Sequence, residues 1–209
     1  LVKFVQPYIK RGVGIELMNT LKSLQDPTSR LRELDMLVES LDELSTERAL
    51  CLDEQRRERE AFNKIITKSS TQKTLEGVVK QLRNIPWRRQ VENQGLGEAE
   101  LAARVQLMRE DHEWDMSELD YNDLEAVHDV RKSAKELRYV TREFSKVLPE
   151  SAGDMTEQAK AVQDKLGELC DCRANARLVV EICGPDAIDT AVRFVMCADE
   201  IIRELESER

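Results

Sequence analysis

The chain has 209 residues and a formal net charge of −9, with 41 acidic and 32 basic side chains. This acidic balance argues against general nucleic-acid binding, for which a basic domain is expected. No apolar run reaches the ~18–20 residues of a membrane span and no signal-peptide pattern opens the chain, so we expect a cytoplasmic protein without membrane contact.

Apolar residues recur at helical spacing almost everywhere and no convincing strand is predicted, so the expected fold class is all-α. Pro27 should break or kink the first long helix, with Asp26 capping the segment that follows. Ser45 and Thr46 offer a cap for a later helix. In chain order we expect the end of a helix at 1–9, helices at 14–26, 28–44, 47–68 and 70–85, a loop at 87–97, a helix near 98–110, an acidic linker, and helices near 121–148, 154–182 and 187–207.

Metal, cofactor and catalytic motifs are not predicted. An odd count of five cysteines without a secretion signal is typical of a reduced intracellular protein. Cys170 and Cys172 do not face the same way on a helix, and no second pair completes a zinc site, so we expect buried thiols. The pairs at Gly12/Gly14 and Gly95/Gly97 lack the third glycine and the preceding strand of a nucleotide motif. His112 should lie in a solvated acidic turn.

The segment 127–146 places one of the two histidines and many cations on a single helix. On a helical wheel, the residues opposite this cationic face are Val130, Ala134, Leu137, Val140, Thr141, Phe144 and Leu148. The residues within about 60° of His128 are Arg131, Lys132, Lys135, Tyr139 and Arg142, with Arg138 at the edge and Lys146 on the same side.

Like-charge pairs at i,i+4 on this face each cost roughly 0.2–0.5 kcal/mol. The positive charge of the face is only partly neutralised by Asp129, Glu136 and Glu143. Three interpretations remain open: a solvated face, internal pairing with upstream acids, or a ligand site. From His128 to Lys146 a helix spans roughly 27 Å, which suits an extended polyanion. The upstream acids are Asp111, Glu113, Asp115, Glu118, Asp120, Asp123 and Glu125.

The pattern His128-x-x-Arg131-x-x-x-Lys135-x-Leu137-Arg138-Tyr139 resembles the signature of the CHAD family, the conserved histidine α-helical domain. The stretches "VQDKLGELCD" (162–171) and "LRELDMLVESL" (31–41) resemble two further elements of that family. Glu136 and Arg173 depart from its pattern, as does the interruption expected at Pro27. The resemblance implies a helical domain of two similar four-helix halves that binds inorganic polyphosphate through its motif helices.

The resemblance also predicts an internal repeat. A shift of 138 positions places Gln25 on Gln163 and Asp26 on Asp164. We therefore expect one CHAD-like domain over 1–209, with two antiparallel four-helix-bundle halves, 1–90 and 91–209, related by pseudo-twofold symmetry. The partner of His128 would fall before Leu1, so the first half is expected to be truncated at its N-terminus. Gly167 would allow close helix approach, and Asp164 and Asp171 would brace the motif bases.

The predicted function is therefore binding of inorganic polyphosphate, without catalysis, by a basic surface or pore. The alternative is a helical scaffold that docks an acidic protein partner through the same face; a metal-dependent phosphohydrolase is disfavoured. The resemblance also allows association with a triphosphate-tunnel (CYTH) domain. The predicted site residues are His128, Arg131, Lys132, Lys135, Arg138, Tyr139 and Arg142, with Lys22, Lys160 and Lys146 as weaker candidates.

Overall fold

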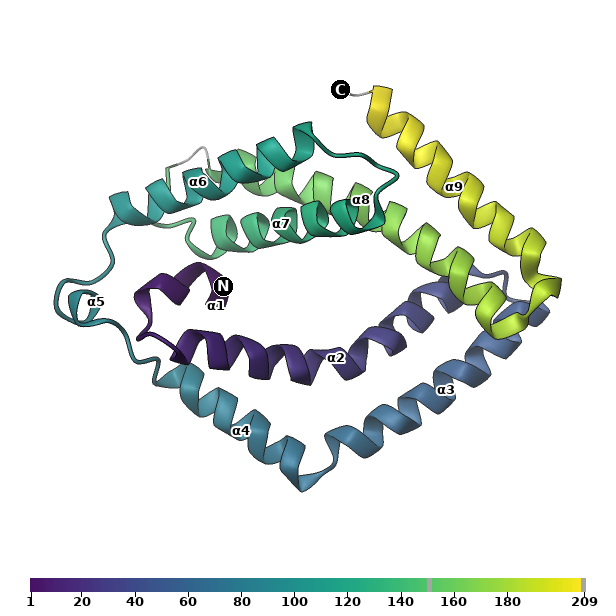
Figure 1. The fold of residues 1–209 in the computed structure, drawn as a ribbon, viewed down its shortest axis with the longest axis horizontal. Helices are drawn as coiled ribbons and strands as arrows, with labels where there is room; N and C mark the ends of the chain where they lie inside the picture. Colours follow the sequence, from purple (N-terminus) through teal and green to yellow (C-terminus); the bar gives the residue numbers. More distant parts are fainter. Residues whose placement is uncertain (150–151, 208–209) are drawn as a thin grey trace. The chain divides into compact units, whose positions relative to one another are not determined.

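A computed structural model describes residues 1–149 and 152–207 and contains helices but no strand within them, which confirms the all-α prediction. None of these helices is long and apolar enough to cross a membrane. The elements in chain order are α1 (Val2–Val5), the 3-10 turn η1 (Gln6–Tyr8), α2 (Val13–Ser40), α3 (Thr46–Ile66), α4 (Ser69–Arg83), α5 (Arg89–Gln94), α6 (Glu98–Ser117), α7 (Leu124–Glu143), α8 (Ala152–Cys183), the 3-10 turn η2 (Pro185–Ala187) and α9 (Ile188–Ser207) (Figure 1).

Short polar side chains and glycine set several helix ends, and the sequence predicts the one at Ser45. Ser45 caps α3, and its hydroxyl accepts a hydrogen bond of 3.1 Å from the backbone N–H of Arg48. Asp123 caps α7 by accepting the N–H groups of Glu125 and Ala126. Gly184, with φ of 78°, follows the last residue of α8, a conformation that favours glycine.

The expected break at Pro27 was wrong, because α2 runs without interruption from Val13 to Ser40 and Asp26 caps nothing. A proline inside a helix costs about 3 kcal/mol. Leu17 and Leu34 are almost fully buried on either side of Pro27, and burying one such side chain contributes roughly 1.5–3 kcal/mol. Tertiary packing on both sides therefore outweighs the local penalty.

Helix α6 is longer than predicted and includes part of the expected acidic linker. Leu101, Val105, Met108 and His112 recur at intervals of four, three and four residues, so they form one inward stripe. The histidine occupies an apolar position of this stripe, and the helix continues past it to Ser117. The sequence prediction ended the helix too early because the acidic side chains around His112 obscured this spacing.

The chain divides into two compact units, each of which is described by itself. Unit 1 comprises the described parts of Leu1–Tyr8, Trp87–Cys170 and Ile201–Arg209, and unit 2 comprises Ile9–Pro86 and Asp171–Glu200. Neither unit coincides with the predicted half 1–90 or 91–209. This division by contacts does not test the repeat, so the pseudo-twofold relation stays a prediction.

Each unit has its own core. In unit 1, α6 and α7 lie side by side (Figure 1), and the buried cluster consists of Phe4, Leu101, Val105, Leu137, Val140 and Ala159. In unit 2, α2 packs against α3 and α4, and the buried cluster consists of Leu37, Val38, Leu41, Cys51, Leu178, Val179 and Ala187.

The five cysteines form no disulfide and differ in exposure. Cys51 is fully buried and its Sγ lies 3.9 Å from that of Cys183. Burial, reinforced by Cys183, raises the pKa of Cys51 to about 12. Cys170 and Cys172 are half-buried rather than buried, and Cys197 is exposed.

We predict that Cys51 resists alkylation in the native protein while Cys197 reacts readily. The thiolate is the reactive form, and the raised pKa of Cys51 leaves almost none of it at pH 8. In iodoacetamide time courses read by peptide mass spectrometry, Cys51 should react at least ~100-fold more slowly than Cys197. Unfolding in urea should remove the difference; equal native rates would show that Cys51 is accessible and ionised.

Candidate anion-binding site

The apolar face of α7 fixes which of its residues reach solvent. Its buried residues recur at helical spacing and are Val127, Val130, Ala134, Leu137, Val140 and Thr141. Leu137 and Val140 pack in the unit 1 core with Phe4 and Val105. The opposite face must therefore point outward, as the helical wheel predicts.

This outward face carries the basic stripe, defined as the seven predicted site residues of α7. Four of them, Arg131, Lys135, Arg138 and Tyr139, are half-buried. His128, Lys132 and Arg142 are exposed. Lys146 is also exposed, but α7 ends at Glu143, so Lys146 does not extend the helical stripe. The stripe from His128 to Arg142 therefore spans roughly 21 Å rather than the predicted 27 Å.

Three cations of the stripe have no carboxylate partner within the part of the chain that the structure describes. Lys132 pairs with Asp129 at 2.7 Å and Arg142 with Glu143 at 2.7 Å. Among residues 1–149 and 152–207, no ion pair joins a carboxylate to Arg131, Lys135 or Arg138. We call these three residues the unpaired cations.

Within the described residues, no ion pair joins an upstream acid to one of the unpaired cations. Glu113 pairs with Arg109 at 2.6 Å, within α6. Asp120 accepts hydrogen bonds from Asn122, and Asp123 caps α7. Internal pairing with these acids, one of the interpretations left open by the sequence, is therefore not found in the described part of the chain.

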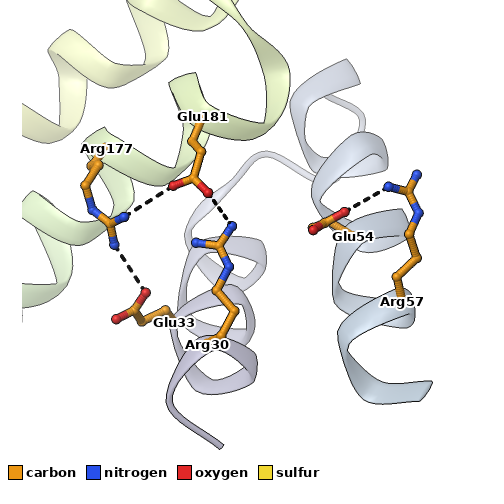
Figure 2. A network of polar contacts seen from close by, with 6 residues as sticks. All are labelled: Arg30, Glu33, Glu54, Arg57, Arg177 and Glu181. Atoms are coloured by element: carbon orange, nitrogen blue, oxygen red, sulfur yellow. Dashed lines mark hydrogen bonds and ion pairs between the residues drawn. The ribbon is translucent and has the colours of Figure 1, made fainter. Parts of the chain in front are cut away.

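Unit 2 contains arginines with the opposite arrangement, because carboxylates compensate Arg30, Arg57 and Arg177 (Figure 2). Glu181 accepts from Arg30 at 2.7 Å and from Arg177 at 3.2 Å, and Arg177 also reaches Glu33 at 3.3 Å. A second pair within α3 joins Arg57 to Glu54 at 2.9 Å. An arginine between helices of this protein can thus be neutralised by a carboxylate, which is not the case for the two unpaired arginines of α7 in the described part of the chain.

Helix α8 contacts two of the unpaired cations through uncharged residues. The Nη1 of Arg138 donates to Oε1 of Gln163 over 3.3 Å. The side chain of Arg131 lies over Gly167, where a Cβ would be only 3.2 Å from its Nε. This Nε is buried and has no hydrogen-bond partner among the described residues, which costs about 1–3 kcal/mol.

The expected bracing by acids is not found for Asp164, which is exposed and makes no ion pair with the stripe within the described ranges. The bracing expected of Asp171 stays a prediction. Gly167 lies against the guanidinium of Arg131, whereas the expectation was the close approach of a neighbouring helix, which stays a prediction. Sequence reasoning missed Gln163 as a contact of the stripe.

Aromatic and acidic neighbours complete the surface. The guanidinium carbons of Arg138 and Arg142 lie 5.8 and 4.8 Å from the centre of the Tyr139 ring, distances within the range of a cation–π contact. Glu136, which departs from the family pattern, pairs with Lys3 at 2.8 Å. The negative charge of Glu136 is thus compensated by α1 rather than by the stripe.

His128 is neutral near pH 7. Partial removal from water, followed by the positive charges of Lys132 and Arg131, lowers its pKa below the ordinary value. Either ring tautomer still has one N–H to donate. An anion bound beside this ring would favour its protonated form.

The weaker candidates lie outside the stripe. Lys160 is exposed on α8 in unit 1, and Lys22 is exposed on α2 in unit 2. The described residues also contain no group of three or more His, Cys, Asp or Glu side chains that could hold a metal ion.

His112 is a structural residue rather than part of a solvated turn, which corrects its predicted setting. It is 6% exposed, and its Nδ1 lies 2.7 Å from the hydroxyl of Ser133. Ser133 donates its only proton to the carbonyl of Val130, so Nδ1–H of His112 donates to Ser133. Burial lowers the pKa of His112, although Asp115 and Glu113 oppose this.

Comparison with known proteins gave a match to one family. A family model of the CHAD domain matches residues 1–180. The chain therefore belongs to the CHAD domain family. No curated protein and no solved structure gave a match.

We predict that His112 makes the protein less stable in acid. Its folded pKa lies below the ordinary value near 6.5, so the unfolded chain takes up the proton first as the pH falls. The stability that depends on neutral His112 is complete above pH about 6.5 and declines below it, towards the folded pKa. Chemical denaturation between pH 7.5 and 5 should therefore give a smaller loss of unfolding free energy for His112→Gln than for the wild type.

The matched control is His128→Gln, because His128 is exposed and lies outside the α6 stripe. It should keep more of the pH dependence than His112→Gln does. An unchanged slope of the unfolding free energy against pH in His112→Gln would mean that the carboxylates, not this imidazole, set the acid response.

The charged groups that face His112 from the surrounding elements are Lys3, Arg104, Arg109, Asp111, Glu113, Asp115 and Glu136.

Proposed function

We propose that this chain binds inorganic polyphosphate through the basic stripe of α7. Membership of the CHAD domain family is consistent with polyphosphate binding in general. The observation that carries the proposal is the set of unpaired cations, Arg131, Lys135 and Arg138, on the outward face of a helix in a protein of net charge −9.

The form of the stripe favours a linear polyanion over a small phosphate ester. Its cations recur at nearly every turn over roughly 21 Å of helix, so one extended ligand can contact several of them. Arg131 and Arg138 offer forked donors that match phosphate oxygens, while Lys135 supplies a point charge. That nucleic acid is not a partner stays a prediction from the acidic composition.

Binding without turnover is the second part of the proposal. The CHAD domain is not a known catalytic domain. We expect no hydrolysis of polyphosphate or nucleoside triphosphates with Mg²⁺, Mn²⁺ or Zn²⁺. Association with a triphosphate-tunnel domain and a cytoplasmic location stay predictions.

We predict that Arg131→Gln, Lys135→Gln and Arg138→Gln together weaken polyphosphate binding at least tenfold, or about 1.4 kcal/mol. The core residues of α7 are unchanged, and removing like charges relieves repulsion, so stability should stay within about 1 kcal/mol. The loss of three phosphate contacts should also change the salt dependence, by analogy with nucleic acids. The slope of the logarithm of the binding constant against the logarithm of the salt concentration should become shallower by roughly two to three. Gel-shift titrations at several salt concentrations, with thermal melting, measure all three quantities.

A matched control removes three arginines that have carboxylate partners. Arg56, Arg57 and Arg59 of α3 are exposed and pair with Asp53, Glu54 and Asp35. Their replacement by Gln makes the same change in net charge and should leave binding within about twofold of the wild type. If both triple variants lose affinity equally, general charge rather than the stripe governs binding.

Competition separates polyphosphate from an acidic protein partner. Long-chain polyphosphate should displace a labelled polyphosphate probe. A polyglutamate peptide of equal charge should compete poorly, because its carboxylates lie at the ends of separate side chains, whereas the charged groups of polyphosphate form the chain itself. Stronger competition by the peptide would favour the scaffold alternative. Unfolding of the stripe variant with normal binding by its folded fraction would show that these bases are structural.

We predict that affinity for polyphosphate rises as the pH falls from 8 to 6, through His128. Its pKa in the free protein is lowered, and the phosphate charge raises it in the complex, so binding takes up a proton. The gain should be roughly twofold to tenfold, the contribution of one charge-assisted hydrogen bond. His128→Gln should bind with no such rise; a rise that persists in this variant assigns the proton to another group.

A further inference from the structure

The two arginines among the unpaired cations stand at the boundary between α7 and α8. They are seven residues apart, which places them on one edge of α7 about two turns, or roughly 10.5 Å, from each other. Their neighbours on α8 are Gln163 for Arg138 and Gly167 for Arg131. The hydroxyls of Thr141 and Thr156, 2.7 Å apart, continue the same boundary.

Gln163 holds an arginine without neutralising it. Its amide oxygen accepts from Nη1 of Arg138 at 3.3 Å, which restricts the side chain as a carboxylate would but contributes no charge. Elsewhere in the chain, Glu181 fills the corresponding role for Arg30 and Arg177 and cancels their charge (Figure 2). The amide at 163 thus keeps the guanidinium both ordered and fully cationic.

Gly167 leaves the space in which the other arginine lies. A Cβ at this position would stand 3.2 Å from Nε and 3.7 Å from Nη2 of Arg131. Nε is the nitrogen of Arg131 that is buried without a hydrogen-bond partner among the described residues. The edge of the guanidinium that carries Nε and Nη2 therefore faces Gly167 on α8.

We propose that α8 forms the second wall of the anion site, and that Gln163 and Gly167 are positioning residues for Arg138 and Arg131. The two guanidinium groups then bind separate phosphoryl groups of one polyphosphate chain that runs along the α7–α8 boundary, with Lys135 between them. This inference rests on the proposed function and adds the path of the ligand and the residues that present its donors.

The test replaces Gln163 by Glu, which has nearly the same shape and places a carboxylate beside Arg138. Polyphosphate affinity should fall at least fivefold, because one cation is neutralised internally. For the same reason, the slope of the logarithm of the binding constant against the logarithm of the salt concentration should become shallower by roughly one. The melting temperature should stay the same or rise, because a new ion pair forms. A merely structural role for Gln163 would not change the salt slope.

Gln158→Glu is the matched control. Gln158 is exposed on the same helix and points about 140° away from Gln163. The Gln158→Glu variant has the same change in net charge as Gln163→Glu and should bind polyphosphate within twofold of the wild type. Wild-type affinity in Gln163→Glu, or equal losses in both variants, would overturn the inference.

A second pair of variants tests the glycine. Gly167→Ala should weaken polyphosphate binding at least threefold, because the guanidinium of Arg131 must move away from α8. Gly153→Ala lies in the same helix with nothing within 4 Å of the added Cβ, and should bind like the wild type. Equal affinities for these two variants would remove Gly167 from the site.

The outcomes also separate this inference from the proposed function. If the wild type binds no polyphosphate, the proposed function fails. If the wild type binds and the triple stripe variant does not, while Gln163→Glu and Gly167→Ala bind normally, the stripe is the site and α8 is not its second wall.

Discussion

The packing of the apolar face of α7 into the unit 1 core determines everything described about the candidate site. Leu137 and Val140 are almost completely buried, and each such side chain contributes roughly 1.5–3 kcal/mol. Like-charge neighbours such as Arg131 and Lys135 cost only about 0.2–0.5 kcal/mol per pair. The hydrophobic term therefore orients the helix, and the cationic face is held outward despite its internal repulsion.

Net charge is a poor guide to such a surface. The chain is acidic overall, with a net charge of −9, but exposed charges further apart than about 8 Å are largely screened at physiological ionic strength. The potential at the stripe is thus set by its immediate neighbours. Asp129 and Glu143 each compensate one cation of the stripe. Glu136 is paired with Lys3, and Gln163 carries no charge, so positive charge prevails locally.

The two histidines show how burial changes the meaning of a residue type. Both have a lowered pKa, and removal from water is the main cause in each case. For His112 this keeps a core residue neutral and bonded to Ser133. For His128 the cations Arg131 and Lys132 add to the effect, so its proton affinity reports on the charge of the stripe. The same direction of shift therefore has a structural role in one helix and an electrostatic one in the other.

Local periodicity was enough to predict the long helices and both faces of α7, because a 3.6-residue repeat is encoded within each segment, and a short polar side chain indicated the cap at Ser45. It missed the six-residue α5 (Arg89–Gln94), where a loop was expected over 87–97, because so short a helix has little periodicity to detect. It failed at Pro27 and around His112, where burial by distant parts of the chain overrides the local signals of a helix breaker and of an acidic turn. The sequence by itself also determined which residues form the stripe. Only the tertiary structure decided which of those cations remain unpaired, and that Gln163 and Gly167 are their neighbours, because pairing depends on contacts between helices that no spacing along one helix specifies.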